Sequence, residues 1–174
     1  MKNRSRLVLP AFPVLAAVAA WSLPGCAATV TPPRAGFKAS TTYLHLLAKT
    51  PFFTALNREQ LQWVIDHSKE WSVSAGTEIS SSSESPDNFW VLLDGGWQVE
   101  FETKRAPAGH ADPAKWYGGS DFAALPGPSR LTATAQSYVM NIRTADLAAM
   151  RAQGFAFDKH LQDVMRFYRG FLVR

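Results

Sequence analysis

The stretch Phe89-Trp90-Val91-Leu92-Leu93-Asp94-Gly95-Gly96-Trp97-Gln98-Val99-Glu100-Phe101 decides the fold class. Its first half is a dense apolar run. Its second half alternates Trp97, Val99 and Phe101 with polar neighbours, which is the period-two pattern of a half-buried β-strand. Asp94 and Gly95 between the halves are typical turn residues. We therefore predict two strands joined as a β-hairpin.

Further short segments with strand patterns lie on both sides of this hairpin. Alternation or β-branched composition predicts strands at 71–73, 77–79, 131–135 and 138–142, whereas 105–115 has the composition of a loop. Helical spacing predicts helices at 43–48, 58–69, 145–153 and about 157–172. Asn57 and Thr144 are expected to cap the second and third of these helices.

This order of elements resembles the cyclic nucleotide-binding domain family. The matching pieces are the short helix leading to Pro51-Phe52-Phe53, the Gly-containing turn 74–79, and the predicted hairpin 89–101. The resemblance covers nearly all of residues 41–174. It implies an α+β fold, an antiparallel β-roll or jelly-roll-like barrel flanked by N-terminal and C-terminal helices.

In that family a ligand cassette follows the hairpin, and the resemblance implies which residues would form it. There a Gly-Glu pair opens a short helix and binds the ribose, while an Arg-x-Ala element closes the cassette and pairs with the cyclic phosphate. Here Ser120 or Asp121 replaces the glutamate, and Arg130 is followed by Leu131 and Thr132. The candidate ligand-binding residues are Gly118, Gly119, Asp121, Phe122, Arg130 and Thr132.

The changed cassette leaves two interpretations. A buried cyclic phosphate needs an arginine fork or several free N–H groups, because an unpaired buried charge is very costly. Since Asp121 would repel an anion and Arg130 is out of the family's pattern, we expect the cassette not to bind cyclic nucleotide. The alternative is a sensor of a small anionic ligand, cyclic-nucleotide-like, that uses the stretch from Gly118 to Arg130.

The N-terminus indicates where the protein works. A short basic segment, residues 1–6, precedes an apolar run, residues 7–20, which is too short and too rich in proline to span a bilayer. Leu23, Gly25 and Cys26, the single cysteine, resemble the lipobox of bacterial lipoproteins. We predict a signal peptide over 1–25, a lipidated Cys26 with a flexible tether over 26–40, and one domain over 41–174.

The predicted location in the cell envelope limits which partners the protein can meet. Ala27 in place of an aspartate favours the periplasmic side of the outer membrane over the inner membrane. Without Lys2, Arg4 and Arg6 the chain has 15 basic and 14 acidic side chains, so the net charge of +4 is no sign of nucleic-acid binding. We expect attachment to the membrane through Cys26, a protein partner in the cell envelope, an unknown small ligand as a second option, and no nucleic acid.

The sequence contains no pattern that predicts catalysis. Nucleophile elbow, P-loop and zinc-protease motifs are absent, and the loop His110-Ala111-Asp112 has too few ligands for a structural zinc. We therefore predict a non-catalytic binding or interaction module of the cell envelope, with no metal and no cofactor. His45, His67 and His160 are expected to be surface or half-buried residues and not ligands.

Two aromatic features each have two interpretations. Trp116, Tyr117 and Phe122 fit core packing better than a contact surface for a ligand or partner. The last helix carries an apolar stripe that could pair with another protein, although packing on the protein's own β-roll is preferred. The stripe consists of Phe157, Leu161, Val164, Tyr168 and Phe171.

Overall fold

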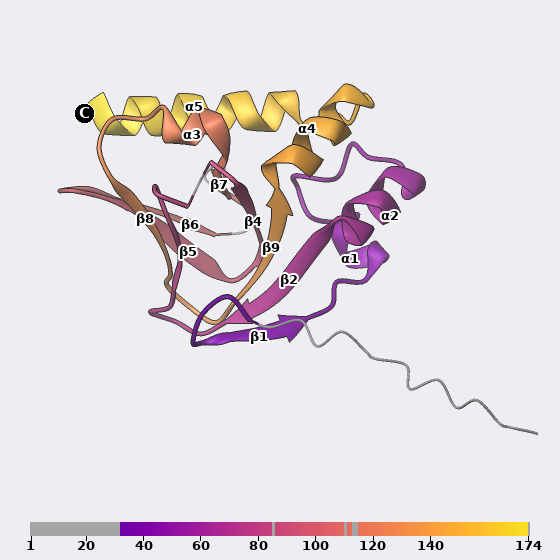
Figure 1. The fold of residues 1–174 in the computed structure, drawn as a ribbon, viewed down its shortest axis with the longest axis horizontal. Helices are drawn as coiled ribbons and strands as arrows, with labels where there is room; N and C mark the ends of the chain where they lie inside the picture. The colour runs from indigo at the N-terminus through magenta and orange to yellow at the C-terminus, as the bar shows by residue number, and fades with distance from the viewer. Residues whose placement is uncertain (1–31, 85, 110, 113–114, 174) are drawn as a thin grey trace, which may run out of the picture.

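The computed structural model describes residues 32–84, 86–109, 111–112 and 115–173. Leu23, Gly25 and Cys26 lie outside the described residues, as does His110, so the roles expected for them stay predictions. Within the described part, two antiparallel sheets face each other and helices cover their open sides (Figure 1).

The larger sheet has five strands and the smaller sheet has four. In spatial order, the larger sheet contains β1 (Phe37–Ser40), β2 (Ser68–Val73), β9 (Ser137–Arg143), β4 (Asn88–Asp94) and β7 (Trp116–Gly118). The smaller sheet contains β3 (Glu78–Ser81), β8 (Ser129–Ala133), β5 (Gly96–Phe101) and β6 (Arg105–Gly109). All the pairings between these strands are antiparallel.

The dense apolar run and the alternating run belong to different sheets, so the predicted hairpin is wrong. Strand β4 pairs with β9 and β7, whereas β5 pairs with β8 and β6. Residues Phe89–Leu92 are buried on both faces, because β4 lies inside a sheet that is covered on both sides. Strand β5 keeps one face toward solvent. The predicted turn therefore carries the chain from one sheet to the other.

Gly95 makes that crossing possible. Its φ is +89°, and a Cβ there would lie 2.5 Å from the carbonyl oxygen of Gln136. Only glycine accepts both the left-handed backbone and this close approach. Asp94 supports the turn by accepting a hydrogen bond from the Gly95 N–H over 2.8 Å.

Two segments expected to be irregular form edge strands. Phe37–Ser40, at the end of the expected tether, forms β1 and pairs with β2. Residues Arg105–Gly109, expected to be loop, form β6 at the edge of the smaller sheet. Pro107 argued against a strand here, because proline has no N–H to donate to a neighbouring strand. In an edge strand such as β6 the missing N–H can be tolerated.

The N-terminal helices are close to their predicted positions. Helix α1 is Leu44–Leu47, and α2 is Arg58–Asp66. Asn57 caps α2 as expected, accepting from the Gln60 N–H while the Gln60 side chain accepts from the Asn57 N–H. Helix α2 ends before Lys69, the predicted limit, because β2 already begins at Ser68.

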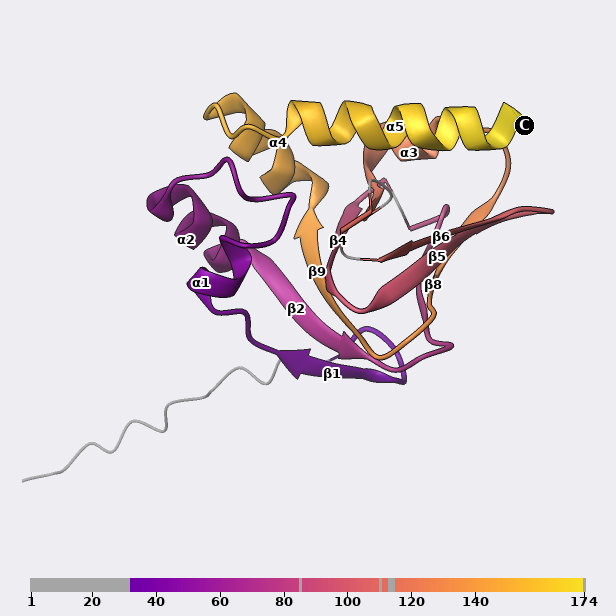
Figure 2. The same cartoon turned by 180° about the vertical axis from the view of Figure 1, so that it is seen from behind.

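The C-terminal helices lie across one end of the roll, as both views show (Figures 1 and 2). Helix α4 is Thr144–Ala152, so Thr144 is its first residue and Arg143 occupies the N-cap position expected for Thr144. Helix α5 is Asp158–Val173. Its apolar residues Leu161, Val164 and Tyr168 are buried, and Tyr168 contacts Phe101 of β5 with 6.0 Å between ring centroids, which confirms the preferred interpretation of packing on the roll. No helix in the described ranges is long and apolar enough to cross a membrane.

The space between the sheets is filled by large aromatic side chains. Trp116, Tyr117 and Phe122 are at most 2% exposed, so the contact-surface interpretation of these residues is wrong and the core interpretation is confirmed. Trp71 and Trp90 contact Phe37 edge-on, at 5.9 and 6.1 Å between ring centroids. Aromatic pairs of this kind add to the stabilisation that burial itself provides.

Candidate functional site

The predicted cassette connects the two sheets across the mouth of the roll. Strand β7 ends the larger sheet, helix α3 (Gly119–Ala123) follows it, and β8 enters the smaller sheet. Gly118 makes the turn between β7 and α3 with φ +110°, and a Cβ there would lie 2.0 Å from the Asn88 carbonyl oxygen. The first glycine of the predicted cassette is thus required for close backbone packing.

Arg130 lies on the outer face of the smaller sheet. Along β8, Ser129, Leu131 and Ala133 are buried, whereas Arg130 is exposed and Thr132 is half-buried. Arg130 stands opposite Glu100 in the strand register, and its Nε donates to a Glu100 carboxylate oxygen over 3.1 Å. This hydrogen bond holds the pKa of the Glu100 carboxyl below its usual value and raises the pKa of Arg130. The guanidinium is therefore already paired, and it is outside the roll.

The inner side of the cassette is occupied by the protein's own side chains. Tyr117, Leu131 and Tyr168 have no exposed surface, and Phe122 has almost none. Ring centroids of Tyr117 and Phe122 lie 4.3 Å apart, and those of Phe122 and Tyr168 lie 5.0 Å apart. Leu131 from β8 completes this packing between the two sheets.

Ser129, rather than Arg130, is the polar residue that faces this interior. Its hydroxyl and the Tyr117 hydroxyl lie 3.0 Å apart and share a hydrogen bond, and the Tyr117 hydroxyl also lies 3.3 Å from the Ser129 carbonyl oxygen. Burial raises the pKa of Tyr117 to about 12, so the phenol is neutral at physiological pH. Burial raises the pKa of Tyr168 as well. The interior of the cassette thus contains neutral, mutually satisfied groups.

The six candidate ligand residues are not gathered into one site. Gly118, Gly119 and Phe122 are buried inside the cassette. Asp121 is exposed and lines a shallow groove along α5 that also includes Arg166 and Arg169. The side chains of Arg130 and Thr132 belong to the outer face of the smaller sheet.

A hollow of about 510 Å³ lies between the β5–β6 turn and the end of the cassette, where Pro128, Ser129 and Arg130 line it. Its cationic residues are Lys104, Arg105 and Arg130. Lys104 donates to the carbonyl oxygens of Phe171 and Leu172 at the end of α5, and Arg130 is paired with Glu100. Lys104 and Arg130 are therefore already bound to other groups of the protein.

Comparison with solved structures gives this architecture a name. No family model matches the sequence, and no curated protein matches it. The structure "Sp-2Cl-cAMPS bound to PKAR CBD2" superposes with a TM-score of 0.58 at 18% identity, over 75% of this chain and 86% of that one. The structure "cAMP bound PfPKA-R (141-441)" gives 0.59 at 18% identity, over 75% of this chain and 45% of that one.

A third structure agrees with these two. A protein from Geobacter metallireducens GS-15, named for cyclic nucleotide binding, gives a TM-score of 0.55 at 23% identity over 72% of this chain and 94% of that one. The fold is that of cyclic nucleotide-binding domains. The predicted fold class, an antiparallel β-roll flanked by helices, is thereby confirmed.

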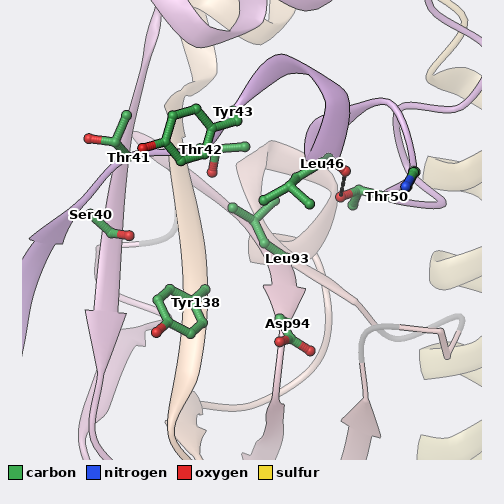
Figure 3. Close-up of a pocket in the computed structure, with 10 residues that line it drawn as sticks. Ser40, Thr41, Thr42, Tyr43, Leu46, Thr50, Leu93, Asp94 and Tyr138 are labelled. Carbon is green, nitrogen blue, oxygen red and sulfur yellow. Dashed lines mark hydrogen bonds between the residues drawn. The ribbon is translucent and has the colours of Figure 1, made fainter.

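The cyclic nucleotide-binding fold of this chain has another hollow, away from the cassette, that the sequence did not predict. It measures about 390 Å³ and lies between α1 and the ends of β4 and β9. Figure 3 shows Tyr43, Leu46, Leu93 and Tyr138 among the side chains that line it, with Asp94 at its edge. These residues come from three distant segments, so no pattern within one of the segments predicts the hollow.

His67 and His160, two of the described histidines, contact other groups of the protein. His67 stacks on Trp63, with 3.5 Å between ring centroids, and its Nδ1 lies 2.8 Å from the Trp63 carbonyl oxygen. His160 is half-buried, and burial lowers its pKa. Within the described ranges, no group of three or more potential metal ligands comes together.

Proposed function

We propose that this chain is a non-catalytic binding module of the bacterial cell envelope, attached to the membrane through an acylated Cys26 and facing the periplasm. The observation that carries the proposal is the closed cassette. Its interior is packed with Tyr117, Phe122 and Tyr168, and its arginine is paired with Glu100 on the opposite face of the sheet. The β-roll then acts as a rigid scaffold, and binding takes place on its surface.

The energetics favour this reading over binding of cyclic nucleotide. Admitting a nucleotide between the sheets would displace buried aromatic side chains, each of which contributes a few kcal/mol to folding, about 3–5 kcal/mol for a Phe truncated to Ala. The phosphate would then meet the hydroxyls of Ser129 and Tyr117 rather than a guanidinium. A buried anion without a cationic or multiple N–H partner is strongly disfavoured.

The attachment can be tested independently of the cassette. Mass spectrometry of the protein from native membranes is expected to find acyl chains on Cys26 and no residue before it. A soluble protein with an unmodified Cys26 would refute the anchored module. Crosslinking in intact envelopes is expected to capture a protein partner, and capture is expected to persist in Arg130→Ala, since Arg130 is already paired with Glu100.

Thermal melting with cyclic nucleotides tests the closed cassette. At a ligand concentration one hundred times its Kd, a binding protein is stabilised by about 2.7 kcal/mol. We expect cyclic AMP and cyclic GMP at millimolar concentration to leave the melting temperature unchanged. A rise that Arg130→Ala abolishes would favour the alternative function, a sensor of a small anionic ligand through the stretch from Gly118 to Arg130.

A further inference from the structure

Large hydrophobic side chains are exposed at four places in the described residues, and three of them surround one hollow. Tyr43 is 63% exposed, Leu46 is 50% exposed and Tyr138 is 43% exposed, and all three line the hollow of Figure 3. The fourth, Val173, ends α5. We call Tyr43, Leu46 and Tyr138 the tyrosine patch. Single exposed hydrophobic residues are common, but a cluster of them marks an interaction surface.

The tyrosine patch is near the place where the chain enters the domain. In the larger sheet Tyr138 stands opposite Ser72, and Ser72 stands opposite Lys38 of β1. Two strand spacings, about 10 Å, therefore separate Tyr138 from β1. Shortly before β1, Arg34 is fixed to the domain by ion pairs with Glu78 and Glu84.

The distance from Cys26 to this fixed point is short. Arg34 is eight residues after Cys26, and eight residues span at most about 29 Å when fully extended. With Cys26 acylated at the bilayer surface, Arg34 stays within that distance of the lipid headgroups. Strand β1 begins three residues after Arg34, so β1, and with it Tyr138 two strands away, lies close to the anchored end of the domain.

The chemistry of the patch fits a membrane interface. Tyrosine rings are enriched at the level of the headgroups, where one end of the side chain is apolar and the other is hydrated. Lys49 lines the hollow and Lys38 is exposed beside it, and each lysine near an anionic lipid surface contributes about 1 kcal/mol of attraction. The Asp94 carboxylate at the edge of the hollow is engaged by the N–H of Gly95.

We propose that the tyrosine patch lies in the headgroup layer of the membrane that holds Cys26, so that the cassette end of the roll and α5 face away from the lipid. This inference rests on the anchored module proposed above. The patch contacts lipid, and the anchor and patch together fix the orientation of the domain. Partner-binding surfaces are then expected on the distal side.

The tyrosines of the chain provide a direct test. There are four: Tyr43 and Tyr138 in the patch, and Tyr117 and Tyr168 without exposed surface. Lactoperoxidase, a soluble enzyme, iodinates only tyrosines that it can reach from water. The probe is the acylated protein in vesicles of phosphatidylethanolamine and phosphatidylglycerol, carrying Val173→Tyr as an exposed internal reference at the end of α5.

On vesicles, we expect iodination of Tyr43 and Tyr138 to fall roughly tenfold relative to the reference tyrosine. An unanchored form that keeps residues 27–174 is expected to show all three tyrosines reactive. The double variant Tyr43→Ser/Leu46→Ser, which changes exposed residues only, is expected to restore iodination of Tyr138 on vesicles.

The outcomes separate the two proposals. If Cys26 is acylated and the patch tyrosines react as readily as the reference on vesicles, the patch proposal is refuted and the anchor stands. If the unanchored form shows the same protection, a second copy or another segment covers the patch, and lipid does not. If Cys26 is not acylated, the distance argument is lost and both proposals are overturned.

Discussion

The cassette and the tyrosine patch differ in what they do with aromatic side chains. In the cassette, Tyr117 and Phe122 are buried and the nearby arginine is paired with a carboxylate. In the tyrosine patch, Tyr43 and Tyr138 project into solvent around an open hollow. The interior of the cassette is thus filled by the protein's own side chains, whereas the tyrosine patch leaves aromatic surface available for contact.

Truncating an aromatic residue in each region gives the largest contrast. Phe122→Ala is expected to lower the free energy of unfolding by about 3–4 kcal/mol, because it opens a cavity between the rings of Tyr117 and Tyr168. Tyr43→Ala, at an exposed position, is expected to change it by less than about 0.5 kcal/mol. Urea denaturation followed by circular dichroism measures both. Equal costs for the two variants would contradict the contrast.

Glycine substitutions test the backbone of the cassette. Gly118→Ala is expected to destabilise the fold by about 2 kcal/mol or more, because of its φ of +110° and the Asn88 carbonyl oxygen only 2.0 Å from the new Cβ. Gly170→Ala is the matched control, since its Cβ would meet nothing within 4 Å, and it is expected to stabilise α5 by about 0.5–1 kcal/mol. Thermal melting measures both, and a neutral Gly118→Ala would refute the close packing of β7 against β4.

Arg130, on the outer face of the smaller sheet, is expected to contribute little to the free energy of unfolding. Arg130→Ala and Glu100→Ala are each expected to cost less than about 1 kcal/mol, since exposed ion pairs gain little in water. Their coupling in a double-mutant cycle is expected to shrink further at high salt. A cost of several kcal/mol for Arg130→Ala would indicate that this side chain supports the interior of the cassette.

The smallest effect concerns Glu70, a half-buried carboxyl group next to the hollow. Glu70 stands opposite Ser40, a residue of the hollow, and burial raises its pKa although hydrogen bonds from Thr42 lower it. Because the native carboxyl holds its proton more tightly than the unfolded one, its contribution is favourable at low pH and is lost as the pH rises through the folded pKa.

Glu70→Gln removes that titration. The variant is therefore expected to gain melting temperature over the wild type as the pH increases from about 4 to 7, by no more than about 3 °C. Calorimetric melts across this range measure the difference. If the melting temperatures of the two proteins changed with pH in parallel, the Glu70 carboxyl would be solvated, which would contradict its burial in the sheet beside the patch.

Local patterns predicted most of the secondary structure but not the partners of the strands. The period-two pattern at Trp97, Val99 and Phe101 located β5, and Asn57 located the start of α2. Both strands of the predicted hairpin exist, yet strand pairing depends on which face each strand must bury. The apolar run Phe89–Leu92 is buried on both faces, which it achieves between β9 and β7 of the larger sheet and not beside β5.

The candidate site was harder to predict for a similar reason. In β8 a shift of one residue reverses the face of a side chain, so the order of Ser129 and Arg130 decides which of them faces the interior. The resemblance singled out the stretch from Gly118 to Arg130, but it did not predict this register. The hollow at the tyrosine patch is lined by residues near 43, 93 and 138, and no pattern within a single segment predicts that these three segments meet.

Calorimetric titration of the full acylated protein with cyclic AMP tests the central claim most directly, because the claim is that the protein's own aromatic side chains occupy the cassette. The account predicts no saturable heat up to millimolar nucleotide, for the wild type and for Arg130→Ala alike. Saturable binding of one nucleotide per chain, lost in Arg130→Ala, would contradict it.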